Sequence, residues 1–358
     1  MNNKNEGALD NKCPNCQATL AFDPILGKWN CKYCDSTFTL EELQKHNNAS
    51  SEKNNMNETN EKIDISHVSY HCKNCGAEII ADEQTAATFC IYCGNTAILK
   101  SKLSNQFAPD KIIPFKTEKK QAIEAFKKLS KGRPLVPKDF NSEKNIEKIK
   151  GVYIPFWLYD IKVDGTINMD AKKIDSWRSG DTQYTKTSIY KLYRTGGMEF
   201  HGVPVDGSTR FDDDIMNSLE PFHYEELQKY NHAYLSGFFA EKYDVESDAA
   251  YEDAIKRSLE SAKDIMMSDS IGYSSKIVYE NTLAPTLMKK EYIMLPVWMV
   301  NVKYKDKMHI FAMNGQTGEF IGNIPLDKKK AVIYGAITFI ISALVCILVS
   351  YIFFKIGE

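Results

Sequence analysis

The sequence predicts a mixed α+β protein with two small zinc ribbons near its N-terminus and one membrane-spanning helix at its C-terminal end. Three observations lead to this prediction. Eight of the nine cysteines form four C-x-x-C pairs, the middle of the chain alternates helical and β-type patterns, and residues 331–354 are uncharged and mostly apolar. A length of 358 residues is enough for several domains, so one fold need not explain the whole chain.

The first elements are the cysteine pairs. CPNC and CKYC lie within residues 13–34, CKNC and CIYC lie within residues 72–93, and fourteen residues separate the pairs in both segments. Zn²⁺ prefers four thiolates in a tetrahedron, and each C-x-x-C turn presents two sulfurs on one face. We therefore predict two structural zinc ions per chain. The predicted ligands are Cys13, Cys16, Cys31, Cys34, Cys72, Cys75, Cys90 and Cys93.

The two cysteine segments differ in the residue that follows the pairs. Gly76 and Gly94 follow pairs of the second segment, where a residue with positive φ turns backbone N–H groups toward sulfur. Gln17 and Asp35 stand at these places in the first segment, so we expect the first site to be looser. His67 and His71 lie near Cys72 and are candidates for outer or alternative ligands, although solvated histidines are the expectation.

A polar segment separates the two ribbons. HNNASSEKNNMNETNEK, residues 46–62, has no periodicity and almost no apolar residues, which is typical of a disordered linker. We therefore place ribbon 1 at residues 1–45, the linker at 46–66 and ribbon 2 at 67–103, and we expect the ribbons to move independently. The same spacing in both ribbons also predicts that they are a tandem repeat.

The body, residues 104–326, is predicted to be an α+β unit with an internal repeat, about 107–246 and 247–326. PFWLYDIK at 155–162 and PVWMVNVK at 296–303 share the pattern P-x-W-x-x-x-x-K, with Asp160 and Asn301 at matching positions. Each follows an amphipathic helix. The predicted helical faces are Ile123, Phe126 and Leu129 in the first copy, and Tyr251, Ile255, Leu259 and Ala262 in the second.

Turn signals follow both motifs. Asp164-Gly165 predicts a hairpin in the first copy, and NGQTG at 314–318 predicts one in the second. The first copy is longer, and we assign an insertion to residues 176–246. Within it, LEPFHYEELQKY predicts a short helix after a turn.

The C-terminal segment, residues 327–358, is predicted to be a membrane anchor. Twenty-four uncharged residues in a helix are about 36 Å long, which is enough to cross a hydrocarbon core of about 30 Å. Lys328, Lys329 and Lys330 precede the span and Lys355 alone follows it, so the positive-inside rule predicts a cytoplasmic N-terminus and an outside C-terminus. The paired cysteines agree, because free thiols need a reducing compartment.

Charge and motifs bear on the class of function. Residues 1–103 carry 10 Lys and no Arg against 13 acidic residues, so we do not expect these ribbons to bind nucleic acid. The sequence contains no phosphate-binding loop of the G-x-x-x-x-G-K-[ST] type, no H-E-x-x-H and no G-x-S-x-G. We therefore expect no enzymatic activity.

The combination of these features resembles a known family. Tandem C-x-x-C ribbons, a body containing LEPFHYEELQKYNHAYLSGFFAEKYD and one C-terminal span resemble the zinc-ribbon membrane proteins of low-GC Gram-positive bacteria. These are labelled as transcription factor IIB type zinc ribbons or as replication-restart-helicase-like. Some members resemble the envelope-stress protein encoded beside a phage-shock protein A homologue and a flotillin-like protein. The resemblance implies membrane recruitment of such partners.

We accordingly expect a single-pass cell-membrane adaptor whose cytoplasmic zinc ribbons recruit partner proteins. Two alternatives remain open. The first is a membrane-tethered protein that binds nucleic acid. The second is a protein whose aromatic body binds a ligand or acts as an enzyme of unknown chemistry.

Overall fold

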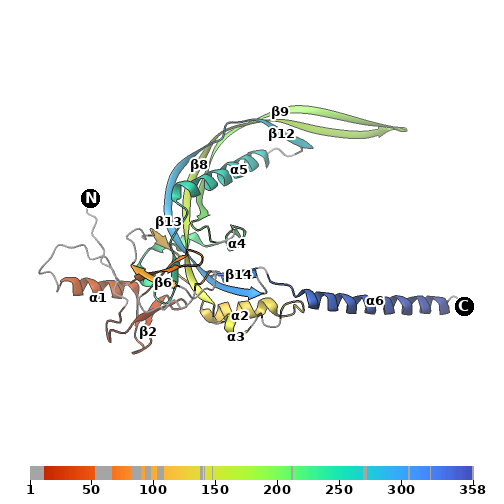
Figure 1. Cartoon of the computed structure of the whole chain (residues 1–358). Coiled ribbons are helices and arrows are strands. Elements are labelled where there is room, and N and C mark those ends of the chain that lie inside the picture. The colour runs from red at the N-terminus through yellow and green to blue at the C-terminus, as the bar shows by residue number, and fades with distance from the viewer. Residues whose placement is uncertain are drawn as a thin grey trace.

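The structure is a computed structural model that describes residues 12–52, 67–82, 90–92, 98–102, 109–137, 140, 142–146, 148–210, 213–268, 272–304, 307–322 and 324–356. It confirms the predicted α+β class. Sheet predominates, the cysteine clusters lie at the N-terminal end, and a long apolar helix forms the C-terminal end (Figure 1).

The helices and strands differ widely in length, from two-residue strands to the 30-residue strand β8. The helices are α1 Leu40–Glu52, α2 Lys119–Ser130, α3 Glu143–Ile146, α4 Asp213–Ser218, α5 Ser247–Ser268 and α6 Lys328–Ile356, with 3₁₀ turns η1 Tyr224–Glu226 and η2 His232–Leu235. The strands before the body are β1 Leu20–Asp23, β2 Lys28–Cys31, β3 Thr37–Phe38, β4 His67–Cys72, β5 Glu78–Asp82 and β6 Ile98–Lys102. The strands of the body are β7 Lys111–Ile112, β8 Lys150–Ser179, β9 Thr182–Asp206, β10 Gln228–Lys229, β11 Phe239–Glu241, β12 Ser275–Asn281, β13 Ala284–Tyr304, β14 Lys307–Asn314 and β15 Phe320–Gly322.

Ribbon 1 is a three-stranded sheet of β1, β2 and β3 that packs on the body. Trp29 is buried and donates its Nε1–H to the backbone oxygen of Ala233 in η2, at 2.9 Å. Its ring contacts Phe22 and Tyr234, with centroids 4.9 and 5.2 Å away. The expectation that this ribbon moves independently is therefore wrong, because its largest aromatic side chain is part of the body's core.

The helix α1 crosses the predicted boundary between ribbon 1 and the linker. It begins after Thr39, whose hydroxyl accepts from the Glu42 N–H while Glu42 accepts from the Thr39 N–H, a capping box. The helix continues to Glu52, so the first part of the predicted linker is helical. The remaining linker residues, 53–66, lie outside the described residues.

Ribbon 2 is joined to the body through backbone hydrogen bonds. β4 pairs with β5 and β6, and β5 pairs antiparallel with β11 through Ile80–Ala240 and Ile79–Glu241. These strands form one end of a twelve-stranded sheet. The second ribbon is thus not an independent module either, and its knuckles lie against the body.

The centre of the body is the antiparallel pair of β8 and β13, which carry the two P-x-W motifs. Two short strands flank this pair. β7, from the first predicted copy, pairs parallel with β13 of the second copy, while β11 pairs parallel with β8. Trp157 donates to the Val245 oxygen just before α5, and Trp298 donates to the Thr117 hydroxyl just before α2. Each motif Trp thus holds the helix start of the other half. The internal duplication itself stays a prediction.

Side chains alternate between two cores across this central pair. On β8, Tyr153 points into one apolar cluster while Val152 and Ile154 point into the other. On β13, Met294 and Trp298 lie on the first side, and Ile293, Leu295 and Val297 lie on the second. Both faces of this part of the sheet are therefore buried, which explains its nearly continuous apolar sequence.

The hairpin predicted at Asp164-Gly165 is wrong. Gly165 lies inside β8, which continues to Ser179, and the turn to β9 lies at Gly180, with φ 61°. A Cβ at Gly165 would lie 2.5 Å from the Thr282 backbone oxygen, so the glycine serves a close backbone approach. The hairpin predicted at 314–318 is confirmed, since β14 and β15 pair around it.

The face that α5 turns to the sheet agrees with the predicted one at Ala262, but otherwise lies one position before the predicted Tyr251, Ile255 and Leu259. Its buried residues are the small or flexible ones, Ala250, Ala254, Ser258, Ala262 and Met266, whereas Tyr251 and Leu259 lie at the flank. The small side chains let the helix lie close to β8 and β9 (Figure 1). The predicted face of α2 is confirmed, with Phe126 buried.

The C-terminal helix α6 projects away from the body (Figure 1). Within its segment Lys328–Val349, an 18-residue stretch has a mean hydropathy of 2.7, and none of that stretch is buried within the protein. Lys330 Nζ donates to the Val136 oxygen at 2.5 Å, and the Asp327 N–H donates to the Leu135 oxygen, so the base of the helix is attached to the body. By length and composition this helix can span a membrane.

Candidate metal centres

The first cysteine cluster has the geometry of a four-thiolate metal site. Cys13, Cys16, Cys31 and Cys34 place their sulfurs within 4.8 Å of one another. The Sγ–Sγ distances are 3.6 Å for Cys13 and Cys34, and 3.4 Å for Cys16 and Cys31. A tetrahedron with Zn–S bonds of about 2.3 Å needs sulfurs about 3.8 Å apart, so the donor set fits Zn²⁺.

The backbone of the three knuckles that the structure describes in full follows one pattern. The N–H groups of Gln17, Asp35 and Gly76 donate to the oxygens of the cysteines four residues earlier, at 2.8–2.9 Å. All three have positive φ, 62°, 54° and 73°. The first ribbon therefore adopts the glycine conformation with non-glycine residues, which strains its backbone at both knuckles. The expectation that its site is looser stays a prediction.

The thiols of the first cluster differ in acidity before a metal binds. The Ser36 hydroxyl and then its backbone N–H stabilise the Cys34 thiolate and lower its pKa to about 6. For Cys16, the Ala18 N–H favours the thiolate, but burial and the neighbouring cysteines outweigh it and raise the pKa to about 12. A divalent ion would displace the remaining thiol protons, so metal binding releases protons here.

The second cluster contains three described cysteines. Cys72, Cys75 and Cys90 have their sulfurs within 4.8 Å of one another, and those of Cys75 and Cys90 are 3.6 Å apart. The fourth predicted ligand, Cys93, lies outside the described residues, so its role stays a prediction. His71 is exposed on β4 and does not belong to the group.

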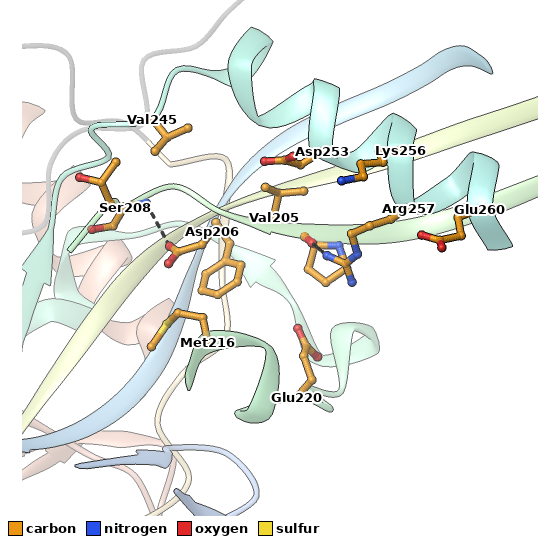
Figure 2. Close-up of a pocket in the computed structure, with 13 residues that line it drawn as sticks. Val205, Asp206, Ser208, Met216, Glu220, Val245, Asp253, Lys256, Arg257 and Glu260 are labelled. Atoms are coloured by element: carbon orange, nitrogen blue, oxygen red, sulfur yellow. Dashed lines mark hydrogen bonds between the residues drawn. The ribbon is translucent and has the colours of Figure 1, made fainter. Parts of the chain in front are cut away.

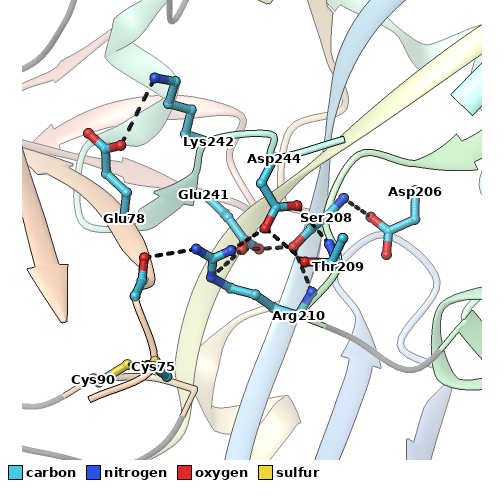
Figure 3. Close-up of polar contacts among 11 residues, drawn as sticks. Cys75, Glu78, Cys90, Asp206, Ser208, Thr209, Arg210, Glu241, Lys242 and Asp244 are labelled. Carbon is cyan, nitrogen blue, oxygen red and sulfur yellow. Dashed lines mark hydrogen bonds and ion pairs between the residues drawn. The ribbon is translucent and has the colours of Figure 1, made fainter. Parts of the chain in front are cut away.

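Two side chains of the body hold the knuckles of the second cluster. Asn301 is buried and donates through Nδ2 to the oxygens of Ile91 and Tyr92, in the CIYC knuckle. Arg210 donates through Nη2 to the Gly76 oxygen, at 2.9 Å, after the CKNC knuckle (Figure 3). Both halves of this centre are thus positioned by residues far along the chain.

Arg210 also belongs to a network with acidic residues, of which Glu241 is buried and Asp244 is partly exposed (Figure 3). It contacts Asp244 through Nη1 and Glu241 through Nε, the latter at 3.5 Å, while Ser208 donates to Glu241 at 2.8 Å. Burial raises the pKa of Glu241 to about 7, although the hydrogen bonds of Ser208 and Tyr92 and the charge of Arg210 oppose the shift. Burial prevails because Arg210 is shared with Asp244 and Gly76.

Sequence reasoning found one part of this arrangement and missed the rest. It singled out Asn301 because its motif matched the one containing Asp160, which accepts from the Gly202 N–H at 2.8 Å. Arg210, Glu241 and Ser208 belong to no recognisable sequence motif. The sequence indicated them only weakly, through a basic residue in the predicted insertion and an acidic residue within the apolar run of β11.

A cleft lies beside the Arg210 network, and Ser208 and Thr209 belong to both (Figure 2). Its volume is about 390 Å³, and α5, β9 and α4 line it. The charged lining residues are Asp206, Glu220, Asp253, Lys256, Arg257 and Glu260. Arg257 is partly committed, because its Nη1 donates to the Pro204 oxygen at 2.6 Å.

Comparison with known proteins finds a bacterial relative. The uncharacterized protein YdjG of Bacillus subtilis strain 168 is 35% identical over 319 residues, which cover 89% of this chain and 91% of that protein. No family model matches the chain, and no solved structure matches it.

Proposed function

The chain belongs to the family of the Bacillus subtilis protein YdjG, and on that premise we propose that it is a membrane-anchored adaptor that recruits partner proteins to the cytoplasmic face. The proposal combines the two features that the chain possesses, cysteine clusters fit for zinc and an apolar helix fit for anchoring. It assigns no catalytic step to the protein.

The observation that carries the proposal is the surface of ribbon 1. Tyr33, within the CKYC knuckle, is 83% exposed, and Ile25 and Leu26, between β1 and β2, are both 57% exposed. A zinc-bound knuckle and a short hairpin would hold these side chains in place before a partner arrives. Such a preformed surface binds at little cost in ordering.

The orientation follows from charge. Lys328, Lys329 and Lys330 begin α6, so the ribbons and the body lie in the cytoplasm and the C-terminus outside. We extend the resemblance to partners of the phage-shock protein A and flotillin-like types, within an envelope-stress response. Zinc supplies rigidity at both clusters in this proposal.

The experiment follows a fluorescently tagged candidate partner in cells under envelope stress. The full chain is compared with an Ile25→Asp, Leu26→Asp variant and with a chain ending at Lys330. We expect the partner to leave the membrane in both cases, because one variant lacks the docking surface and the other lacks the anchor.

A matched control places the same charge on an exposed isoleucine elsewhere. Ile265→Asp on α5 changes a similarly exposed side chain and should leave the partner at the membrane. An unchanged location in the ribbon variant would reject ribbon 1 as the docking surface. Salt-sensitive binding of DNA by the full chain would favour the nucleic-acid alternative.

A further inference from the structure

The outer end of the β8–β9 hairpin extends well beyond the rest of the body (Figure 1). We refer to residues 172–191 as the hairpin arm. Pairing of β12 with β8 ends at Lys172, and the last buried residue of α5 is Met266, which lies with Ile167 and Met169. Beyond that point β8 and β9 pair with each other alone among the described strands.

Large apolar side chains are exposed on the arm. Trp177 and Tyr184 stack across the two strands, with ring centroids 5.6 Å apart and planes 12° from parallel, yet they are 51% and 46% exposed. Ile189 is 66% exposed, and Ile174 and Tyr190 are also exposed. An isolated two-stranded ribbon is marginally stable in water, so this surface calls for a partner.

The charge of the arm indicates what that partner is. The segment holds five basic and two acidic side chains, a net charge of +3, whereas the whole chain carries −2. Within the described part of the chain, the basic residues Lys173, Arg178 and Lys186 have no ion pair with a carboxylate. Basic residues mixed with Trp and Tyr are typical of surfaces that bind anionic bilayers.

The position of the arm fits the same partner. The arm extends toward the same side of the body as α6 (Figure 1). The arm runs beside α6 and extends past the base of that helix (Figure 1), so in a chain anchored by α6 it reaches the cytoplasmic surface of the bilayer. The cytoplasmic leaflet, which faces the body in the proposed orientation, carries anionic lipid.

We propose that the hairpin arm is a second membrane contact, which lies on the anionic surface of the cytoplasmic leaflet with Trp177 and Tyr184 at the level of the headgroups. This inference rests on anchoring by α6 but not on the recruitment of a partner protein. A second copy of the chain fits less well. Two arms of charge +3 repel each other, and Lys186 and Lys191 on β9 disfavour pairing along its edge.

Trp177 offers a direct test, because Trp29 and Trp298 are buried and Trp157 is half-buried. The full chain is inserted into nanodiscs at one chain per disc, with phosphatidylcholine that is brominated near the headgroup end of the acyl chain. Discs with and without added phosphatidylglycerol are compared. The Trp177→Phe variant gives the signal of the other three tryptophans, which is subtracted.

We expect bromine quenching of Trp177 in the anionic discs and much less in the neutral ones. In the Lys173→Gln, Arg178→Gln, Lys186→Gln variant the arm should bind the anionic surface on the order of a hundredfold more weakly, since each Lys or Arg at such a surface contributes about a factor of five. A matched variant, Lys28→Gln, Lys32→Gln, Lys73→Gln, changes three exposed lysines of the ribbons and should keep the quenching.

Two results would overturn the proposal. One is quenching that is absent, or equal with neutral and anionic lipid, in discs with one chain. The other is a change in Trp177 emission that needs two chains in one disc, which would assign the arm to contact between copies. Because no partner protein is present, failure here leaves the adaptor function unaffected.

Discussion

Gln17 and Asp35 show how a single backbone angle distinguishes the two ribbons. Both lie in the left-handed region, where Gly76 stands in the second ribbon with open space around its missing Cβ. A non-glycine residue there costs about 1 kcal/mol, and Asp tolerates the region better than Gln. The strain is therefore concentrated at Gln17.

The replacement Gln17→Gly should strengthen metal binding by the first cluster by up to about fivefold, since it removes roughly 1 kcal/mol of strain and returns part of that gain as chain entropy. Competition with a chromophoric zinc chelator measures the effect. The reverse change, Gly76→Gln, should weaken the second cluster by a similar factor. Equal affinities in all three proteins would contradict the strain argument.

Glu241 makes folding depend on pH. Its pKa in the folded protein is about 7 against an ordinary value of 4.5, so the folded state holds the proton more tightly than the unfolded state. The contribution of this carboxyl to stability is therefore greatest below pH 4.5 and decreases as the pH rises to about 7. The total decrease is roughly 3 kcal/mol.

The Glu241→Gln variant should lose this dependence. Its melting temperature should therefore fall less than that of the unmodified protein between about pH 5 and about pH 8, which lie on either side of the raised pKa. Thermal unfolding of the detergent-solubilised chain measures it. The exposed Glu199→Gln serves as the control and should keep the normal profile. Parallel profiles for unmodified and Glu241→Gln proteins would show that another group governs the dependence.

At the scale of elements, the second ribbon behaves as part of the sheet. β5 pairs with β11, and Asn301 and Arg210 hold the two knuckles. Loss of its metal should therefore affect the body, whereas loss of the first metal should act mainly on the contact of Trp29 with η2.

The double change Cys72→Ser, Cys75→Ser should release one of two zinc ions and accelerate amide hydrogen exchange in β11. The change Cys13→Ser, Cys16→Ser should release the other ion and leave β11 protected. Metal analysis with hydrogen exchange read by mass spectrometry distinguishes the two. Unchanged protection of β11 in the first variant would mean that the sheet holds the ribbon without metal.

The sequence predicted the elements whose signal is local. The cysteine knuckles, the NGQTG turn, the apolar face of α2 and the long apolar helix all depend on residues close together in the chain. The hairpin arm, the pairing of β7 with β13 and of β11 with β8, and the Arg210 network depend on contacts between segments that are distant in the chain. The spacing of residues in the sequence does not indicate such contacts. Gly165 was misread for the same reason, because its close neighbour, Thr282, is distant in sequence.

At the scale of the molecule, three attachments fix the geometry. Ribbon 1 is held by Trp29, ribbon 2 by the shared sheet, and the base of α6 by Val136 and Leu135. The ribbons are therefore held at fixed positions on the body. If the chain is the adaptor proposed above, this would fix its docking surface at one height above the bilayer.

Removal of the anchor tests how far the body depends on α6. The described side chains of the helix, such as Val332 and Phe339, are mostly exposed, and none of them belongs to the apolar clusters of the body. A chain ending at Lys330 should therefore keep its folded body and leave the membrane in a high-salt wash, whereas the full chain stays. Fractionation with and without salt measures this, and near-ultraviolet circular dichroism checks the fold.

If the hairpin arm binds lipid as proposed, the truncated chain should remain on anionic vesicles at low salt and come off as salt is added, because screening removes an electrostatic contact but not an apolar anchor. Retention at high salt would instead require a second apolar anchor.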